Sequence, residues 1–307
     1  MNSSTGGHGH GHGHGHSDLN GNKLLFATLL NLVITIAEII GGILSNSLAL
    51  LSDAIHNLGD TVAVMLAWIA NRVSKRSANE RKTFGYKRVE ILAAFINAAT
   101  LIVIIVFLFR EAIVRFQNPE PIKGMLMFIV ASIGLLANLA AVLLLKSDSN
   151  KNINIRAAYL HLLGDTVSSV AVIVSAIFIY FYEVYWLDPV ITILIGIYIL
   201  KETYHVLKES VDILMQASPR HVELNDVKDT LEHLDEVDNI HHVHIWNLND
   251  SLIHFECHID LSIDYKLSET ESVRRKIEVM LEEKYGFNHF TIQFEYNCCS
   301  EKKLINH

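Results

Sequence analysis

The stretch Leu48–Asn71, LALLSDAIHNLGDTVAVMLAWIAN, decides the fold. It is apolar over a length that can cross a bilayer, because about 20 helical residues span the hydrocarbon core. It nevertheless contains His56 and Asp60, which are costly to place in lipid. A second stretch repeats the pattern, since His161–Val167 reads HLLGDTV where His56–Val62 reads HNLGDTV. The sequence therefore predicts a membrane protein with ionisable groups inside the membrane.

Apolar spans continue on both sides of this stretch. Residues 24–71 contain no Lys or Arg, and Asn46-Ser47 divides them into two spans. Further apolar spans cover about 89–109, 122–145, 156–182 and 186–200. A hydrophobic content of 50% and a charged content of only 19% agree with a chain that is largely embedded in lipid. Six transmembrane helices are the expected count.

From about Val206 the composition becomes that of a soluble domain. Local signals predict a helix beginning at Ser218-Pro219, strands over 237–246 and 251–261, a helix with a Ser268/Glu271 capping box that ends at Gly286, and a strand over 291–296. We therefore expect an α-helical membrane protein with six transmembrane helices plus a small α/β domain of α-β-β-α-β order. Its parts are a flexible tail over 1–22, a membrane domain over 23–206 and a soluble domain over 207–307.

The basic residues predict the orientation of the chain. The loop between the second and third spans is rich in Lys and Arg, and the loop between the fourth and fifth carries Lys146, Lys151 and Arg156. The positive-inside rule places both loops and both termini in the cytoplasm. The second and fifth spans then run in opposite directions, as in alternating-access carriers. The loops are short, which favours the plasma (inner) membrane, and a net charge of −8 argues against a nucleic-acid partner.

The repeated pattern has the chemistry of a metal site. The i, i+4 spacing places each His and Asp on one face of its helix. His56, Asp60, His161 and Asp165 together offer two imidazoles and two carboxylates, a set that suits tetrahedral Zn²⁺ and neutralises its charge. The alternative is that these side chains only join helices. Glu38 and Asp53 lie in the first two spans, and either an access path or a structural contact explains them.

At these positions the sequence resembles the cation diffusion facilitator family, particularly its zinc-type branch of bacterial cobalt–zinc–cadmium resistance-like efflux transporters. The resemblance covers about residues 20–297. The matching segments are Ser45–Ala54 with His56 and Asp60, Phe84–Ala94 with Asn97, His161 with Asp165, Asp188-Pro189, His241–Trp246 and Thr291–Glu295.

The resemblance implies a homodimer in the lipid bilayer that moves Zn²⁺ out of the cytoplasm in exchange for protons, with cobalt or cadmium as further substrates. The implied transport ligands are His56, Asp60, His161 and Asp165, and the implied cytoplasmic ligands are His241, His258 and Glu295. Gln293 stands where some relatives carry His, so the second site is either incomplete or borrows His289. In the loop after the second span there is no histidine for a further metal site.

The remaining histidines and cysteines support weaker expectations. The Gly-His tail carries His8, His10, His12, His14 and His16, which would bind Zn²⁺ loosely; a purification tag is the alternative. In the soluble domain, alternation places His254, Glu256 and His258 on one strand face, which is either metal-binding or simply solvated. Cys298 and Cys299 are either thiolate ligands or ordinary reduced thiols.

Two other functions compete with transport. An intramembrane metallohydrolase needs a general base beside its metal, but Asn57 and Leu162 follow the two histidines. We therefore expect a protein that is not an enzyme. A membrane-bound metal sensor that does not transport stays open as the alternative function.

Overall fold

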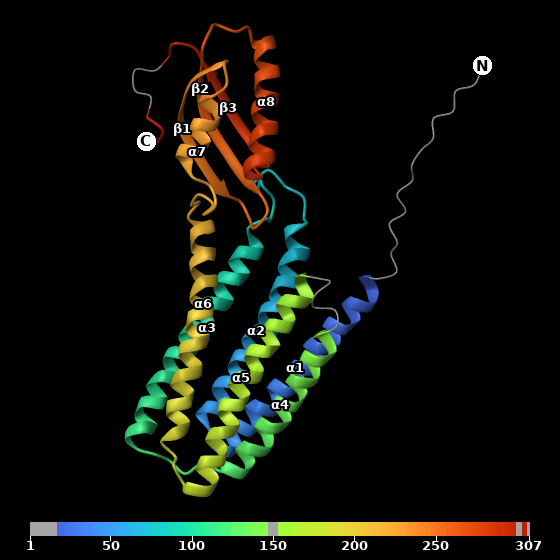
Figure 1. Ribbon diagram of the computed structural model, residues 1–307, viewed down its shortest axis with the longest axis vertical. Helices are drawn as coiled ribbons and strands as arrows, with labels where there is room; N and C mark the ends of the chain where they lie inside the picture. Colours follow the sequence, from blue (N-terminus) through green and yellow to red (C-terminus); the bar gives the residue numbers. More distant parts are fainter. Residues whose placement is uncertain (1–16, 147–152, 299–302, 306–307) are drawn as a thin grey trace, which may run out of the picture. The chain divides into compact units, whose positions relative to one another are not determined.

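The computed structural model describes residues 17–146, 153–298 and 303–305 (Figure 1). The histidines of the Gly-His tail and Cys299 lie outside these residues. The chain divides into two units, one formed by Met1–Val64 and Thr100–Glu202 and the other by Met65–Ala99 and Thr203–His307.

All six predicted long helices form. They are α1 (Ser17–Ser45), α2 (Leu48–Ser74), α3 (Val89–Gln117), α4 (Gly124–Lys146), α5 (Ile153–Tyr182) and α6 (Leu187–Leu214). Within the described residues, α3, α4, α5 and α6 are long and apolar enough to cross a membrane, and α1 contributes the shorter apolar helix Leu29–Ser45. Asn46 separates α1 from α2 with φ of 63°, a conformation that Asn tolerates better than most residues.

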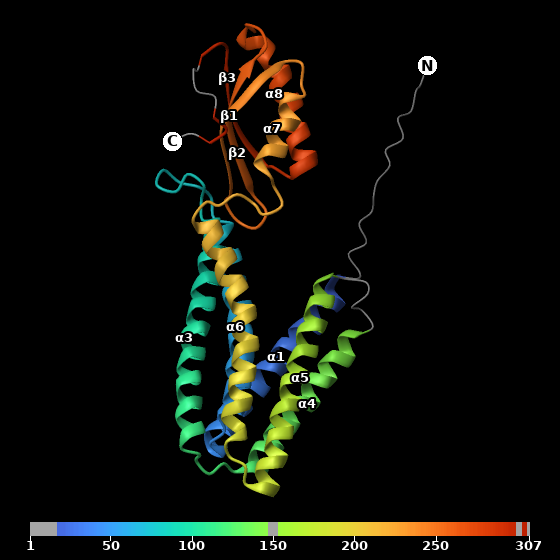
Figure 2. The ribbon, with the colours of Figure 1, turned by 60° about the vertical axis from the view of Figure 1, so that its left-hand side comes forward.

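The first unit is a helical bundle in which α4 packs against both α1 and α5 (Figures 1 and 2). Its core is aliphatic, formed by residues such as Leu50, Ile105, Met127, Val172 and Ile199. Many large apolar side chains on the same helices are exposed, including Val103, Phe107 and Ile133. An apolar exterior around an apolar core is what a bilayer requires of a spanning bundle.

One buried carboxylate joins the ends of two helices. Asp188, in the first turn of α6, accepts hydrogen bonds from the Ser47 hydroxyl at 2.5 Å, the Leu48 N–H at 2.8 Å and the Ala49 N–H at 3.2 Å. The amides of a helix's first turn have no partner within the helix, and a negative charge there also favours the helix dipole. Asp188 thus caps α2 from a distant part of the chain.

The C-terminal domain has the predicted α-β-β-α-β order. It consists of α7 (Leu224–Glu232), β1 (Val237–Asn247), β2 (Ile253–Leu261), α8 (Leu267–Tyr285) and β3 (His289–Glu295). The sheet order is β1-β2-β3, with β1 antiparallel and β3 parallel to β2. Both helices pack on one face of the sheet (Figure 2), over a core that includes Leu231, Ile240, Phe255, Ile277 and Phe287. The other face is left for polar side chains.

Two predicted helix starts in this domain are wrong. Ser218-Pro219 does not begin α7, because Val222 is buried and its N–H closes a separate turn onto Pro219, so the helix starts at Leu224 after Glu223. The capping box of α8 is not Ser268/Glu271: the Glu269 carboxylate accepts the Lys266 N–H at 2.9 Å, which starts the helix at Leu267. Gly286 ends α8 as predicted, with φ of 73°.

The Asp188 cap supports a stability prediction. Asp188→Ala removes the acceptor of three buried donors, which costs about 1–3 kcal/mol for each donor left unsatisfied. We expect a melting temperature several degrees lower in detergent, measured by fluorescence-detected size exclusion after heating. Asp188→Asn keeps one carbonyl oxygen and should lie between Asp188→Ala and the unchanged protein; equal melting of all three would contradict the cap.

Candidate metal centres

The structure brings together the four residues of the repeated pattern, two from α2 and two from α5. His56 Nδ1 lies 3.5 Å from Asp60 Oδ2, and His56 Nε2 lies 3.5 Å from Asp165 Oδ1. His161 Nε2 lies 3.2 Å from Asp60 Oδ2 and 3.7 Å from Asp165 Oδ2. Each imidazole therefore contacts both carboxylates, so that the two helices are joined by crossed His–Asp pairs.

These spacings are close to those that a small metal ion requires. Ligand atoms about 2.0–2.1 Å from a tetrahedral ion lie roughly 3.3 Å apart. His56, Asp60 and His161 each offer one atom within 4.8 Å of the others. His56 presents different nitrogens to Asp60 and to Asp165, so one nitrogen must turn toward both before all four residues can hold one ion.

The glycine of each repeat allows a neighbouring helix to approach the cluster. A Cβ on Gly164 would lie 3.0 Å from the Tyr198 hydroxyl, and one on Gly59 would lie 3.3 Å from the end of Leu101. The Tyr198 ring, on α6, meets the His56 ring edge-on with centroids 6.3 Å apart. Leu101 on α3 and Tyr198 on α6 therefore occupy matching places beside the two repeats.

The structure also shows the contacts of Asp53 and Glu38, the two acidic residues whose role the sequence leaves open. The Ser168 and Ser169 hydroxyls donate to Asp53 at 2.5 and 3.2 Å. The Asn57 amide donates to Glu38 at 3.1 Å. Both carboxyl groups thus join helices of the first unit within a short distance of the four-residue cluster.

The C-terminal domain holds a second cluster on the polar face of its sheet. His258 Nδ1 lies 2.8 Å from Glu295 Oε1, and His241 Nε2 lies 3.3 Å from Glu295 Oε2. The three side chains come from all three strands, and one ligand atom from each lies within 4.8 Å of the others. Burial is uneven, since His241 is 4% exposed whereas His258 remains partly accessible.

A β-bulge places His241 in this cluster. Strict alternation along β1 would turn it toward the core with Val243 and Ile245. Instead the register with β2 shifts between His241 and His244, and His242 takes φ of 52°. The N–H groups of His242 and Val243 donate hydrogen bonds to the carbonyls of Lys303 and Leu304, at 3.2 and 2.8 Å respectively. The extra residue turns His241 to the polar face.

The other soluble-domain candidates lie outside this cluster. Gln293 donates a hydrogen bond to Glu295 at 2.7 Å. His289 contacts His254, with ring centroids 4.5 Å apart, and Trp246 stacks on His254 at 5.2 Å. His289 lies four positions before Gln293 in β3, which is about 13 Å of strand. Cys257 is buried in the core, where desolvation raises the pKa of its thiol, and Cys298 is exposed.

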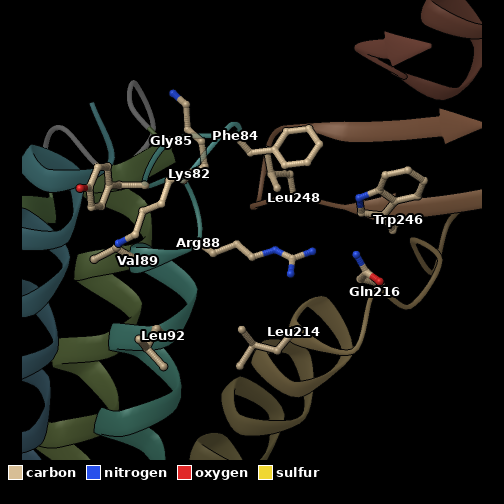
Figure 3. Close-up of a pocket in the computed structure, with 12 residues that line it drawn as sticks. Lys82, Phe84, Gly85, Arg88, Val89, Leu92, Leu214, Gln216, Trp246 and Leu248 are labelled. Carbon is tan, nitrogen blue, oxygen red and sulfur yellow. The ribbon is translucent and has the colours of Figure 1, made fainter. Parts of the chain in front are cut away.

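The second unit also contains an apolar cavity of about 400 Å³ with a basic wall. Figure 3 shows the Arg88 side chain extending into it toward Gln216 and Trp246. Neither His/Asp/Glu cluster contributes a residue to its lining. The cavity is therefore separate from the candidate metal chemistry.

Comparison with known proteins gives one consistent result. Residues 24–215 match the cation efflux transmembrane domain, and residues 219–297 match the cation efflux protein cytoplasmic domain. A cadmium, cobalt and zinc/H⁺-K⁺ antiporter of Bacillus subtilis (strain 168) is 42% identical over 90% of this chain and 89% of its own. The zinc transporter ZitB of Pectobacterium atrosepticum is 41% identical over 94% and 89%, and the metal cation efflux system protein CzcD of Cupriavidus metallidurans is 36% identical over 94% and 90%.

The chain belongs to the cation efflux, or cation diffusion facilitator, family. It is a multi-pass membrane protein with a cytoplasmic domain of the cation efflux type, and its activity is metal-cation efflux rather than catalysis. The resemblance drawn from the sequence motifs is thereby confirmed.

Tyr198 and Gly164 support a prediction about the first cluster. In Gly164→Ala the new methyl group displaces the Tyr198 hydroxyl and with it the ring beside His56. Changes in groups that orient metal ligands typically cost about 10–100-fold in affinity or activity, so we expect metal flux into proteoliposomes to fall about tenfold. Gly59→Ala would place its Cβ 3.3 Å from the end of Leu101, which requires a smaller adjustment than the 3.0 Å contact at Gly164, and should cost less. A larger loss in Gly59→Ala would contradict the role of Tyr198.

Proposed function

We propose that this protein exports Zn²⁺ from the cytoplasm in exchange for protons, with cobalt and cadmium as further substrates. The observation that carries the proposal is the four-residue cluster between α2 and α5, with His–Asp distances of 3.2–3.7 Å. Its two imidazoles and two carboxylates favour zinc over the hard cations calcium and magnesium. Relatives of this chain include zinc transporters and a cadmium, cobalt and zinc antiporter, which agrees with this substrate.

Charge balance supports protons as the counter-ion. With both imidazoles protonated and both carboxylates ionised, the four side chains carry no net charge. A dication bound to neutral imidazoles leaves the cluster equally neutral. Histidine exchanges its proton near physiological pH, so one dication can replace two protons without leaving a net charge in the membrane.

The proposal includes orientation and assembly. The basic loops and the positive-inside rule support an orientation with both termini in the cytoplasm. The short loops support the plasma membrane as the location. Because α2 and α5 then run in opposite directions, the cluster lies between two halves that can open alternately to either side. We assign the C-terminal domain, which matches a cytoplasmic domain of cation efflux proteins, to homodimer formation. The relatives are named for transport, which leaves the sensor alternative without support.

The transport assignment has a direct test. Asp60→Ala or Asp165→Ala should abolish Zn²⁺ flux into proteoliposomes under a pH gradient, because each removes a carboxylate shared by both imidazoles. Flux is followed with an entrapped zinc dye, and Cd²⁺, Co²⁺ and Mn²⁺ are compared in parallel. Asp229→Ala, an exposed change on α7, is the control; proton-coupled zinc flux in either cluster variant would overturn the site.

The second cluster is proposed as a cytoplasmic Zn²⁺ site made of His241, His258 and Glu295. We expect His258→Ala in the full chain to bind about one zinc fewer per chain, since a three-residue site loses one of its ligands. Equilibrium dialysis with metal analysis measures this. His233→Ala, outside the cluster, should bind as the unchanged protein does, and an unchanged zinc count in His258→Ala would contradict the site.

A further inference from the structure

Two carboxyl groups that the four-residue cluster does not use are buried inside the first unit. Glu38 and Asp53 are each only 1% exposed. In the described part of the chain, their hydrogen-bond partners are the neutral side chains of Asn57, Ser168 and Ser169. An ionisable group at membrane depth is costly unless it is compensated, and it marks a functional position more often than not.

The immediate surroundings of Glu38 leave one oxygen without a partner. Its Oε2 accepts the Asn57 amide at 3.1 Å, whereas its buried Oε1 has no hydrogen bond in the structure. Gly134 of α4 makes room for Oε1, because a Cβ there would lie only 2.3 Å from it. Burying a charged carboxylate oxygen without a hydrogen-bond donor costs free energy. A proton on the carboxyl group removes the charge and thereby lowers this cost.

Asn57 can serve Glu38 in both of its protonation states. Its NH₂ group donates to an ionised carboxylate, as the structure shows. Its Oδ1 is buried and unbonded, so half a turn of the amide would let it accept an O–H from a protonated Glu38. The same pair of side chains can therefore stay hydrogen-bonded while Glu38 gains or loses a proton.

The charges that act on Glu38 belong to the metal-binding region. Asp53 on α2 and Asp165 on α5 repel its negative form, and Asp53 in turn interacts with His56 and Asp165. At this level α4 presents Gly134, which carries no charge. The negative groups around Glu38 are thus those that a dication in the cluster would offset.

We propose that Glu38 binds and releases a proton in each transport cycle, as an additional proton-binding group beside the four-residue cluster. This inference rests on the proposed exchange of zinc for protons. When a dication binds, its field favours ionised Glu38, so the O–H bond breaks and the proton leaves to the aqueous side. When the metal departs, and before the imidazoles regain their protons, Asp53 and Asp165 lack a positive charge beside them, and the Glu38 carboxyl group takes up a proton from water. Linkage requires that this proton weaken zinc binding to the same degree that zinc weakens proton binding.

The test is the number of protons released per Zn²⁺ bound by the purified full-length protein. Release is measured in weak buffer with a pH dye while zinc is titrated. We expect Glu38→Gln to bind zinc but to release up to about one proton fewer than the unchanged protein, because an amide cannot titrate. Glu38→Asp keeps a carboxyl group and should retain the full release. Glu111→Gln, on α3 where Glu111 pairs with Arg115 at 3.1 Å, is the matched control and should also retain it.

A second measurement does not depend on the folding of Glu38→Gln. Infrared difference spectra of the unchanged protein should show loss of a protonated carboxyl C=O band on zinc addition, and Glu38→Asp should shift this band. An unchanged proton count in zinc-binding Glu38→Gln would overturn the inference, as would a band that Glu38→Asp leaves in place. Neither result touches the zinc/proton exchange itself, which fails only if the unchanged protein moves no zinc or if Asp60→Ala still does.

Discussion

The crossed contacts between two imidazoles and two aspartates, on α2 and α5, are the interaction on which the structure of the membrane unit depends. A charge in lipid is tolerated only beside its opposite or beside a metal. His56 and Asp165 are buried, whereas Asp60 and His161 keep partial access, so the cluster has a closed side and an accessible side.

The neighbouring helices are arranged around that cluster. Gly59 has no side chain, so Leu101 of α3 can pack against it, and Gly164 likewise leaves room for Tyr198 of α6. Gly134 does the same for α1, where it admits the Glu38 carboxyl group. Inside a bilayer the hydrophobic effect does not drive helices together, so close packing and polar contacts must hold them. Small residues at helix contacts allow this, because backbones and polar groups can then approach closely. The glycines therefore serve the chemistry of the cluster as well as helix packing.

The sequence predicts the six helices, the element order of the C-terminal domain and the four residues of the first cluster, because hydropathy, alternation and a repeated motif are local signals. The members of the second cluster follow from the family resemblance and not from these signals. It does not predict which face His241 occupies, since a bulge of one residue reverses the alternation. Nor does it predict the true starts of α7 and α8, where several residues in a row can cap a helix. The pairing of Glu38 with Asn57 and of Asp188 with Leu48 joins positions far apart in the chain, for which no local pattern exists.

The bond from Asp188 to the start of α2 has a mechanical consequence. It fixes α2 to the start of α6 at one end of the helix, so any tilt of α2 must turn about that point. His56 lies eight residues along the helix from Leu48, about 12 Å from such a pivot. A tilt of about 10° would move its imidazole by roughly 2 Å, comparable to one bond between a metal and its ligand. A small rotation about a fixed end is thus enough to change the distances among the four side chains of the cluster by about the length of such a bond.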